Sequence, residues 1–533
     1  MCGITFTTHP DGLKSVETIK HRGPTSTTVK SFDFQSDRIS MIFNRLSITG
    51  VSNGEQPFYS NGVYVMCNGE IYNHHELREK YNLKCKTQSD CEVILWLYLQ
   101  SDTNQLHELS GEYAFVIFDT RLGNVIYGRD YTGVRPLFIS DDEYFTLCSE
   151  LKGIKALHSK GVQVKPGIIY VYSLFDKNTF QYPLKYKGYP QHARQSLIDA
   201  VKDRINSEVP IGFLLSGGLD SSLILSIASR LIPKTEKITV FTTGFSFDAP
   251  DVVASREVIK YLQSIHGDRY IHHIYIPSID KGIESIPHVI KAIESYDTTT
   301  VRASTPMWML ARYIRNKTNV KVVLSGEGSD EINGSYLYFH YAPSKEEFDK
   351  ERKRLTEDIH LFDGLRADRT ISAFGLELRV PFLDKNVVVD TLATDVYTSA
   401  KSTGIEKYHL RNSFRGFLPE HLLWRTKAAF SDAVSTQWKD ELKQHGDALS
   451  LSNCNTSHLT PRTGEEKWYR SIFEQYYPGQ GGVIPYLWLP RWVDTQGEPS
   501  ATVLDVYTSR NFDGKSSLIP AESTSSTSSV ELV

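Results

Sequence analysis

The spacing of apolar residues changes about one third of the way along the chain. Up to about residue 180, short runs alternate β-branched and aromatic residues with polar ones, and Gly, Asn and Asp separate the runs. A period of two residues is typical of strands in antiparallel sheets. We expect strands within residues 39–48, 62–72, 112–119, 124–130, 143–149 and 167–172. One helix is expected over residues 89–100, where Ser89 or Asp90 can cap its start.

From about residue 193 the pattern alternates helices with short, continuously apolar strands. Helices are expected over residues 194–205, 221–232 and 255–266 and in a long stretch before residue 320. Strands are expected over residues 211–215, 237–245, 271–276 and 320–324. Apolar strands that alternate with helices form parallel sheets covered on both faces. This part of the chain is therefore predicted to be a doubly wound α/β domain.

Two segments of low apolar content divide the chain. Residues 183–192 contain two prolines and a glycine, which is typical of a linker. The end of the chain is rich in Ser and Thr and cannot bury enough apolar surface to order itself. We therefore predict an α+β domain over residues 1–185, an α/β domain over 193–490 and a flexible Ser/Thr-rich tail over 491–533.

Composition and charge narrow the class of protein. The 533 residues are 40% hydrophobic and 23% charged, as in ordinary globular proteins with more than one core. The net charge of -4 argues against nucleic acid or an anionic membrane as the main partner. There is no apolar run of about 20 residues and no secretory signal, so we predict a cytoplasmic protein with small-molecule substrates. Six scattered cysteines without a CxxC pair indicate neither a zinc ribbon nor a disulfide framework.

The strongest motif is IGFLLSGGLDSS, residues 211–222, which lies between an expected strand and an expected helix. Gly217 and Gly218 let backbone amides approach phosphate oxygens, and Ser216, Ser221 and Ser222 add hydroxyl donors at the helix start. The lysine of a GxxxxGK[ST] loop is absent, so this is not the loop used for γ-phosphoryl transfer. The motif predicts a site for an oligophosphate.

A second loop of the same kind occurs in VKVVLSGEGSDE, residues 320–331. Both loops follow apolar strands, so they should meet at the carboxyl edge of one parallel sheet. Asp220 and Asp330 stand at the ends of these loops, where their oxygens can hold Mg²⁺ against the phosphates. Aspartates beside glycines are also common turn formers, which is the alternative reading.

Several motifs in one order carry a family resemblance. SGGLDSS and SGEGSDE, with the starting MCGI and with HRGP, NRLSI, NGEIYN and SDCEVI, make residues 1 to about 440 resemble glutamine-hydrolysing asparagine synthetases. The resemblance implies an N-terminal-nucleophile glutaminase with sandwiched antiparallel sheets, joined to a synthetase domain of the ATP-pyrophosphatase type. It also implies glutamine, aspartate and ATP as substrates and Mg²⁺ as cofactor. A homodimer is a further expectation.

The resemblance assigns roles in the first domain. Cys2, exposed by removal of Met1, attacks the glutamine amide with its own α-amine as general base. Asn68 and Gly69 form the oxyanion hole. Arg45 holds the carboxylate of glutamine, and Glu70 and Asp90 hold its ammonium. The full set expected to bind glutamine is Arg45, Leu46, Ser47, Ile48, Thr49, Asn68, Gly69, Glu70 and Asp90.

In the second domain the resemblance implies that aspartate attacks the α-phosphorus of ATP, giving β-aspartyl-AMP and diphosphate. Mg²⁺ and Lys427 neutralise the developing charge, and Glu327 takes a proton from the arriving ammonium. Ammonia is expected to reach this site through an interior channel. The residues expected to bind ATP are Leu214, Ser216, Gly217, Gly218, Leu219, Asp220, Ser221, Ser222, Thr243, Ser325 and Gly326.

Two arginines in matching segments have less specific roles. Arg302, in residues 294–307, is expected to help hold aspartate or phosphate, with aspartate as the assigned ligand. Arg379, in residues 368–384, either serves the site or braces it. The segment that begins with the second loop, SGEGSDEINGSYLYFH, departs from the family pattern at Asn333 and Ser335. No functional role is assigned to residues beyond 440.

Two rival readings stay open. One is an amidotransferase of the same architecture that acts on another carboxylate, which the segment 294–307 disfavours. The other is a silent binding or regulatory protein that kept the fold, since a fold alone does not establish function. Intact Cys2, Asp220, Glu327 and Lys427 argue against the second.

Overall fold

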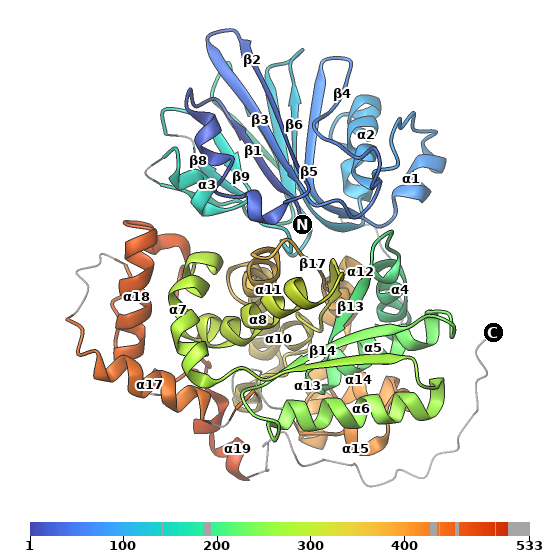
Figure 1. Ribbon diagram of the computed structural model, residues 1–533, viewed down its shortest axis with the longest axis vertical. Helices are drawn as coiled ribbons and strands as arrows, with labels where there is room; N and C mark the ends of the chain where they lie inside the picture. The colour runs from blue at the N-terminus through green and yellow to red at the C-terminus, as the bar shows by residue number, and fades with distance from the viewer. Residues whose placement is uncertain are drawn as a thin grey trace.

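A computed structural model describes residues 1–140, 142–158, 160–184, 193–426, 434–435, 437–452, 458–495 and 497–509. The chain begins in a layered arrangement of strands, at the top of Figure 1, and continues into a parallel sheet surrounded by helices below it. The expected linker lies almost wholly in residues 185–192, outside this description. No helix in the described ranges is long and apolar enough to cross a membrane.

The N-terminal part contains two sheets whose strand pairs are antiparallel, in the orders β10-β8-β9-β1-β3-β2 and β12-β11-β7-β6-β5-β4. The first sheet comprises β1 (Gly3–Thr7), β2 (Ser26–Phe34), β3 (Asp37–Arg45), β8 (Phe138–Ser140), β9 (Thr146–Cys148) and β10 (Val162–Gln163). The second comprises β4 (Phe58–Ser60), β5 (Val63–Ile71), β6 (Gly111–Asp119), β7 (Asn124–Arg129), β11 (Ile168–Ser173) and β12 (Thr179–Pro183).

Alternation along these strands builds the core between the two sheets. Ile4 and Phe6 of the first sheet lie in one buried cluster with Val116 and Phe118 of the second. The next residues along β6, such as Phe115, instead pack with helices on the outer face of the second sheet. The helices of this part are α1 (His74–Lys80), α2 (Val93–Ser101) and α3 (Leu151–Lys155). The arrangement is the expected α+β sandwich.

The second part is built on a five-stranded sheet, all of whose pairs are parallel, in the order β15-β14-β13-β16-β17. Its strands are β13 (Ile211–Leu214), β14 (Ile238–Thr243), β15 (Tyr270–Tyr275), β16 (Val322–Leu324) and β17 (Glu377–Arg379). The helices up to the end of β17 are α4 (Ala193–Ile205), α5 (Leu219–Leu231), α6 (Pro250–His266), α7 (Ile279–Ile293), α8 (Thr298–Lys317), α9 (Ser329–Asn333), α10 (Lys345–Asp358) and α11 (Asp363–Ser372). This confirms the predicted α/β class.

Short helices follow the sheet. They are α12 (Lys385–Ala393), α13 (Val396–Thr403), α14 (Tyr408–Ser413), α15 (Glu420–Leu423), α17 (Trp438–Ala448), α18 (Gly464–Tyr476) and α19 (Asp505–Ser509). Part of the segment expected to be a flexible tail is packed instead. Leu504 and Val506 are buried in an aromatic cluster with Tyr338 and Phe339. Residues 510–533 lie outside the described part of the chain.

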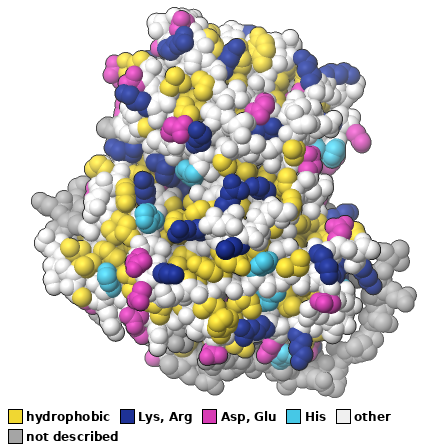
Figure 2. Space-filling model, in the orientation of Figure 1, with side chains coloured by type: hydrophobic (Ala, Val, Ile, Leu, Met, Phe, Trp, Pro, Cys, Tyr) yellow, Lys and Arg dark blue, Asp and Glu magenta, His cyan; other side chains and the backbone are white. Residues whose placement is uncertain are grey.

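The two parts share a buried boundary. Leu46, Ile48 and Val134 of the first part belong to the same buried cluster as the core of the parallel sheet. Elsewhere charged side chains of both signs are interspersed with apolar ones over the face drawn in Figure 2.

Candidate active sites

The Cys2 thiol lies just before β1 and is held by the chain that follows β3. The Leu46 N–H donates to Sγ over 3.4 Å, and burial raises the pKa of the thiol to about 11. A thiol this weakly acidic needs a base to become a nucleophile. The α-amine of Cys2 is the expected base, and in this structure it forms the peptide bond to Met1, whose own amine donates to Leu376 O over 3.4 Å.

The expected oxyanion hole is formed by two adjacent residues of β5. The Asn68 side chain is fully buried, and neither its Nδ2 nor its Oδ1 has a hydrogen-bond partner within the described chain. Gly69 has a φ of 154°, and a Cβ there would lie 2.1 Å from the Glu112 carbonyl oxygen of β6. An unpaired buried amide is costly, so Asn68 is best explained as a group kept ready for a ligand.

Two buried acids lie beside this pocket. Burial raises the pKa of Glu70 well above its usual range, with Asp90 adding repulsion. Burial also raises the pKa of Asp90 to about 6, although the Ile71 N–H donates to this carboxylate over 2.6 Å. Thr49 Oγ1 donates to Glu70 over 2.9 Å. An ammonium group between the acids would relieve their repulsion.

Arg45 at the end of β3 holds the loop that follows it. Its guanidinium donates to the Gly50 carbonyl over 2.6 Å and pairs with Glu55 over 3.1 Å. Residues 46–49 lie in this loop, and Glu208 from the second part accepts from the Gly50 N–H over 2.9 Å. Glu208 was missed from the sequence because it is 158 residues away along the chain. The loop after β3 is thus supported from both parts of the molecule.

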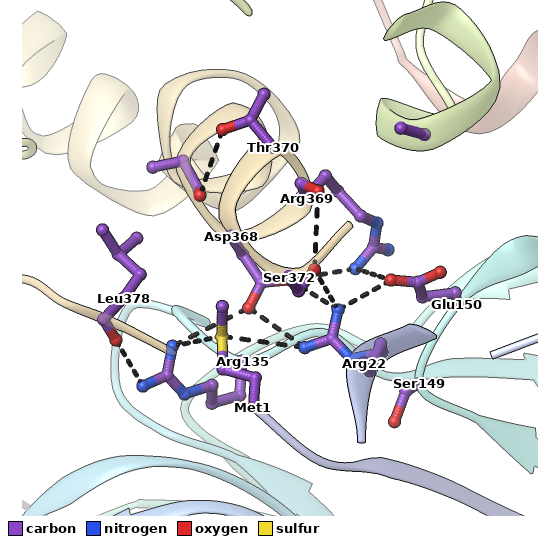
Figure 3. A network of polar contacts seen from close by, with 12 residues as sticks. Met1, Arg22, Arg135, Ser149, Glu150, Asp368, Arg369, Thr370, Ser372 and Leu378 are labelled. Carbon is purple, nitrogen blue, oxygen red and sulfur yellow. Dashed lines mark hydrogen bonds and ion pairs between the residues drawn. The ribbon is translucent and has the colours of Figure 1, made fainter. Parts of the chain in front are cut away.

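A buried ionic network joins the Cys2 pocket to the second part, and Figure 3 shows it. Arg22 Nε donates to the Cys2 carbonyl over 2.9 Å. Its terminal nitrogens pair with Glu150 over 2.7 Å and with Asp368 of α11 over 2.8 Å. Arg379 likewise pairs with Glu377 over 2.9 Å and lies 3.7 Å from Glu70. Arg379 therefore braces the boundary beside Glu70.

The phosphate loop has the expected local geometry. It runs from β13 into α5, and Gly217 has a φ of 73° at a point where a Cβ would lie 2.5 Å from the Ser255 backbone nitrogen. The Gly218 N–H donates to Ser216 Oγ over 3.2 Å, and Ser216 and Ser221 hydroxyls lie 3.1 Å apart. The loop is therefore closely fitted to α6 and prearranged by its own serines.

The second loop meets the first at the edge of the sheet. A Cβ on Gly326 would lie 2.8 Å from the Ser221 nitrogen, so the two loops are in contact. Both loops line one large cavity. Of the residues expected to bind ATP, the cavity is lined by Leu214, Ser216, Gly218, Leu219, Asp220, Ser221, Thr243, Ser325 and Gly326. Gly217 and Ser222 do not line it: the Gly217 carbonyl accepts from Arg425 over 2.8 Å, and the buried Ser222 hydroxyl has no hydrogen-bond partner within the described chain.

The two expected metal ligands converge on one cation. Lys407 Nζ lies 2.7 Å from Asp220 and 2.6 Å from Asp330, and its side chain is 1% exposed. The described residues hold no group of three His, Cys, Asp or Glu side chains suited to a metal. Two carboxylates that face the same position nevertheless suit Mg²⁺, which usually completes its shell with water and substrate phosphates. Lys407 was not anticipated from the sequence.

Glu327 lines the same cavity and is held by Arg366 of α11. The guanidinium makes two contacts with the carboxylate, of 3.0 and 2.7 Å. Burial raises the pKa of Glu327, and Arg366 opposes this. The expected catalytic Lys427 lies outside the described residues.

Arg302, expected to hold aspartate, is placed elsewhere. It is not among the residues that line the cavity, and its guanidinium pairs with Glu465 and Glu498 at 2.6 Å each. This side chain instead ties α8 to α18 and to the chain after it. The sequence pattern could not reveal this, because both partners come from segments beyond residue 440, where the family resemblance ended.

Comparisons with known proteins agree with both halves of this geometry. A family model described as glutamine amidotransferase domain matches residues 1–185, and one described as asparagine synthase matches residues 192–358 and 342–493. A probable asparagine synthetase [glutamine-hydrolyzing] of Acanthamoeba polyphaga mimivirus is 39% identical, over 95% of this chain and all of the relative. The Gallus gallus asparagine synthetase [glutamine-hydrolyzing] is 36% identical, over 96% of this chain and 99% of the relative. The chain belongs to the family of glutamine-hydrolysing asparagine synthetases.

Proposed function

We propose that the protein converts aspartate, glutamine and ATP to asparagine, glutamate, AMP and diphosphate. The observation that carries this proposal is one cavity in which both phosphate loops and Glu327 face the same space. An oligophosphate, an acyl group and a base can meet there. The Cys2 pocket, joined to that cavity by buried contacts, provides a source of ammonia.

In the first half-reaction, Cys2 Sγ attacks the glutamine amide carbon and passes its proton to its own α-amine after Met1 is removed. Asn68 Nδ2 and the Gly69 N–H donate to the oxyanion. Glu70 and Asp90 hold the ammonium of glutamine, and the loop held by Arg45 binds the rest of the amino acid. Ammonia leaves, and water then releases glutamate from the thioester.

In the second half-reaction, the phosphate loops hold ATP while the side-chain carboxylate of aspartate attacks the α-phosphorus. Asp220 and Asp330 would hold Mg²⁺, which when bound neutralises charge on the diphosphate leaving group. Lys407 and Lys427 are proposed to add positive charge at the same place. Glu327 takes a proton from the incoming ammonium so that the amine can attack the acyl-adenylate, which releases AMP.

The proposal is tested by assaying the purified full-length chain with glutamine, aspartate, ATP and Mg²⁺, following asparagine and diphosphate together. Cys2→Ala should abolish glutamine-dependent synthesis and leave ammonia-dependent synthesis intact. A panel of carboxylic acids should also be tested for exchange of diphosphate into ATP. If aspartate fails and another acid supports the exchange, the result favours an amidotransferase that acts on that other carboxylate. A cytoplasmic location and a homodimer are further proposals, tested by cell fractionation and by light scattering of the same preparation.

A further inference from the structure

Trp488 brings an aromatic wall into the ATP cavity from a segment far along the chain. It lies outside helices and strands, after α18, and its side chain is among those lining the cavity. The sequence analysis carried no function to this region. The structure therefore adds a cavity residue from a segment beyond the reach of the family motifs.

The wall is fixed from two directions. The Trp488 backbone N–H donates to Asp297 Oδ1 over 2.7 Å. The other carboxylate oxygen of Asp297 caps α8 by accepting from the Thr300 backbone N–H over 2.8 Å. The indole packs edge-on against Tyr336, with ring centres 5.1 Å apart, and against Tyr338 at 6.0 Å. Trp488 is 8% exposed. A ring held at its backbone and at its edges has little freedom to yield to a ligand.

Acidic side chains connect this wall to the catalytic centre. Tyr336 donates to Glu331 over 2.6 Å, and its hydroxyl also lies 3.1 Å from Asp363. Asp363 pairs with Arg366 over 2.6 Å, and Arg366 in turn holds Glu327. All of these residues line the cavity. The contacts run in an unbroken series from Glu327, beside the phosphate loops, to Trp488.

The charge at this end suits a cationic group on the substrate. The carboxylates of Glu327 and Asp363 both pair with the Arg366 guanidinium, whereas the Glu331 carboxylate accepts from the Tyr336 hydroxyl. These three carboxylates therefore outnumber the one guanidinium, which pairs with two of them. A bound ammonium group would compensate this negative charge. An α-amino acid can place its ammonium here and its side-chain carboxylate toward the phosphate loops.

We propose that Trp488 is a specificity-determining residue that closes the amino-acid end of the cavity and limits the acceptor to a four-carbon amino dicarboxylate. This inference rests on the proposed function. The acidic cluster fixes the ammonium and the phosphate loops fix the reacting carboxylate, so the length between them is set. A five-carbon acid must displace the held indole to fit. One methylene in such a pocket changes kcat/KM by about 10- to 200-fold.

The test compares aspartate with glutamate in acid-dependent exchange of diphosphate into ATP by the full-length protein. Trp488→Ala should lower kcat/KM for aspartate and raise the relative use of glutamate, so that their ratio falls at least about tenfold. Trp488→Phe keeps part of the wall and should give an intermediate ratio. Trp492→Ala is the matched control, because Trp492 packs against Tyr338 and Phe339 without lining the cavity. Its ratio should equal that of the unchanged protein.

Two readouts separate the inference from the function on which it rests. Glutaminase activity at Cys2 reports folding of each variant independently of the ATP cavity. If the unchanged protein shows no aspartate-dependent exchange, the proposed function fails. If the unchanged protein uses aspartate and both Trp488 variants keep its aspartate-to-glutamate ratio while retaining glutaminase activity, the role of Trp488 is overturned.

Discussion

At the scale of single residues, Asn68 shows most directly that a binding site is prepared. Its amide is buried without a hydrogen-bond partner in the described part of the chain, an arrangement that folding alone does not favour. The motif NGEIYN identifies Asn68 as a candidate residue from the sequence. That its side-chain amide lacks a hydrogen-bond partner can be seen only in the structure.

Asn68→Ala should lower kcat for glutamine hydrolysis by about 10²- to 10³-fold, because an oxyanion donor is lost. Synthesis from ammonia should be unchanged. The measurement is glutamate release beside asparagine formation from an ammonium salt. The control is Asn73→Ala in the same motif, where Asn73 donates to the Glu108 carbonyl over 2.9 Å, so its loss should affect stability more than hydrolysis. Equal hydrolysis by the Asn68 variant and the unchanged protein would remove Asn68 from the oxyanion hole.

Asp90 gives a prediction for pH. Burial raises the pKa of Asp90 to about 6, and only the ionised carboxylate attracts the ammonium of glutamine. The kcat/KM for glutamine should therefore be high above pH 6 and fall as the pH drops through about 6. Asp90→Asn should remove this component of the profile and lower kcat/KM at pH 8 by roughly 30-fold, for the loss of about 2 kcal/mol from a charge-assisted contact. A profile identical to that of the unchanged protein would contradict the assignment.

At the scale of elements, the periodicity of apolar residues predicted the well-buried strands and several helices, but not the nine-residue, largely exposed β2. Strands β5, β6 and β7 and helices α4, α5 and α6 lie where the pattern placed them. The pattern missed β1, β2, β4, β8, β10, β12 and β17. β12 (TFQYP) is exposed along its whole length although Phe180 and Tyr182 alternate along it, and β17 has only three residues. The expected helix over residues 89–100 begins as a 3₁₀ turn (Asp90–Glu92), and Ser89 makes no capping bond with its side chain.

The turn between β13 and α5 depends on the glycine at its bend. Gly217→Ala places a Cβ 2.5 Å from the Ser255 backbone nitrogen, at a φ that disfavours L side chains. The KM for ATP should rise at least about tenfold while glutaminase activity stays unchanged. Diphosphate exchange and glutamate release measure the two effects.

Gly267→Ala is the control for that strain. Gly267 has a similar φ of 79° at the end of α6, but no atom lies within 4 Å of the added Cβ. It should lose about 1 kcal/mol of stability without a change in the KM for ATP. If both variants alter ATP use equally, the close approach of the loop to α6 is not what matters.

At the scale of the whole molecule, the site is assembled from segments that sequence order keeps apart. Lys407, Arg366 and Trp488 reach the cavity from positions up to about 270 residues beyond the phosphate loop, so no local pattern could group them. The glutaminase and synthetase motifs could be recognised because each is a short contiguous stretch of sequence. The contacts that join the two parts could not be recognised in this way, because they are buried ion pairs between segments distant in sequence.

Glu112 of β6 is central to that connection. It is 1% exposed, pairs with Arg204 of α4 over 2.7 Å and with Arg135 over 3.0 Å, and accepts from the Val380 N–H over 2.9 Å. Glu112→Gln keeps the size of the side chain and removes the charge that compensates two buried guanidiniums. Breaking such a pair costs about 3 kcal/mol, so the thermal midpoint should fall.

The more informative effect of Glu112→Gln is on coupling between the sites. If the buried boundary keeps released ammonia from water, loosening it should raise the amount of glutamate formed per asparagine, while each half-reaction measured alone persists. Glu108→Gln removes a more exposed charge paired with Lys80 and should leave that product ratio unchanged. A ratio unaltered in the Glu112 variant, despite a lower thermal midpoint, would show that the boundary holds the two parts together without confining what passes between them.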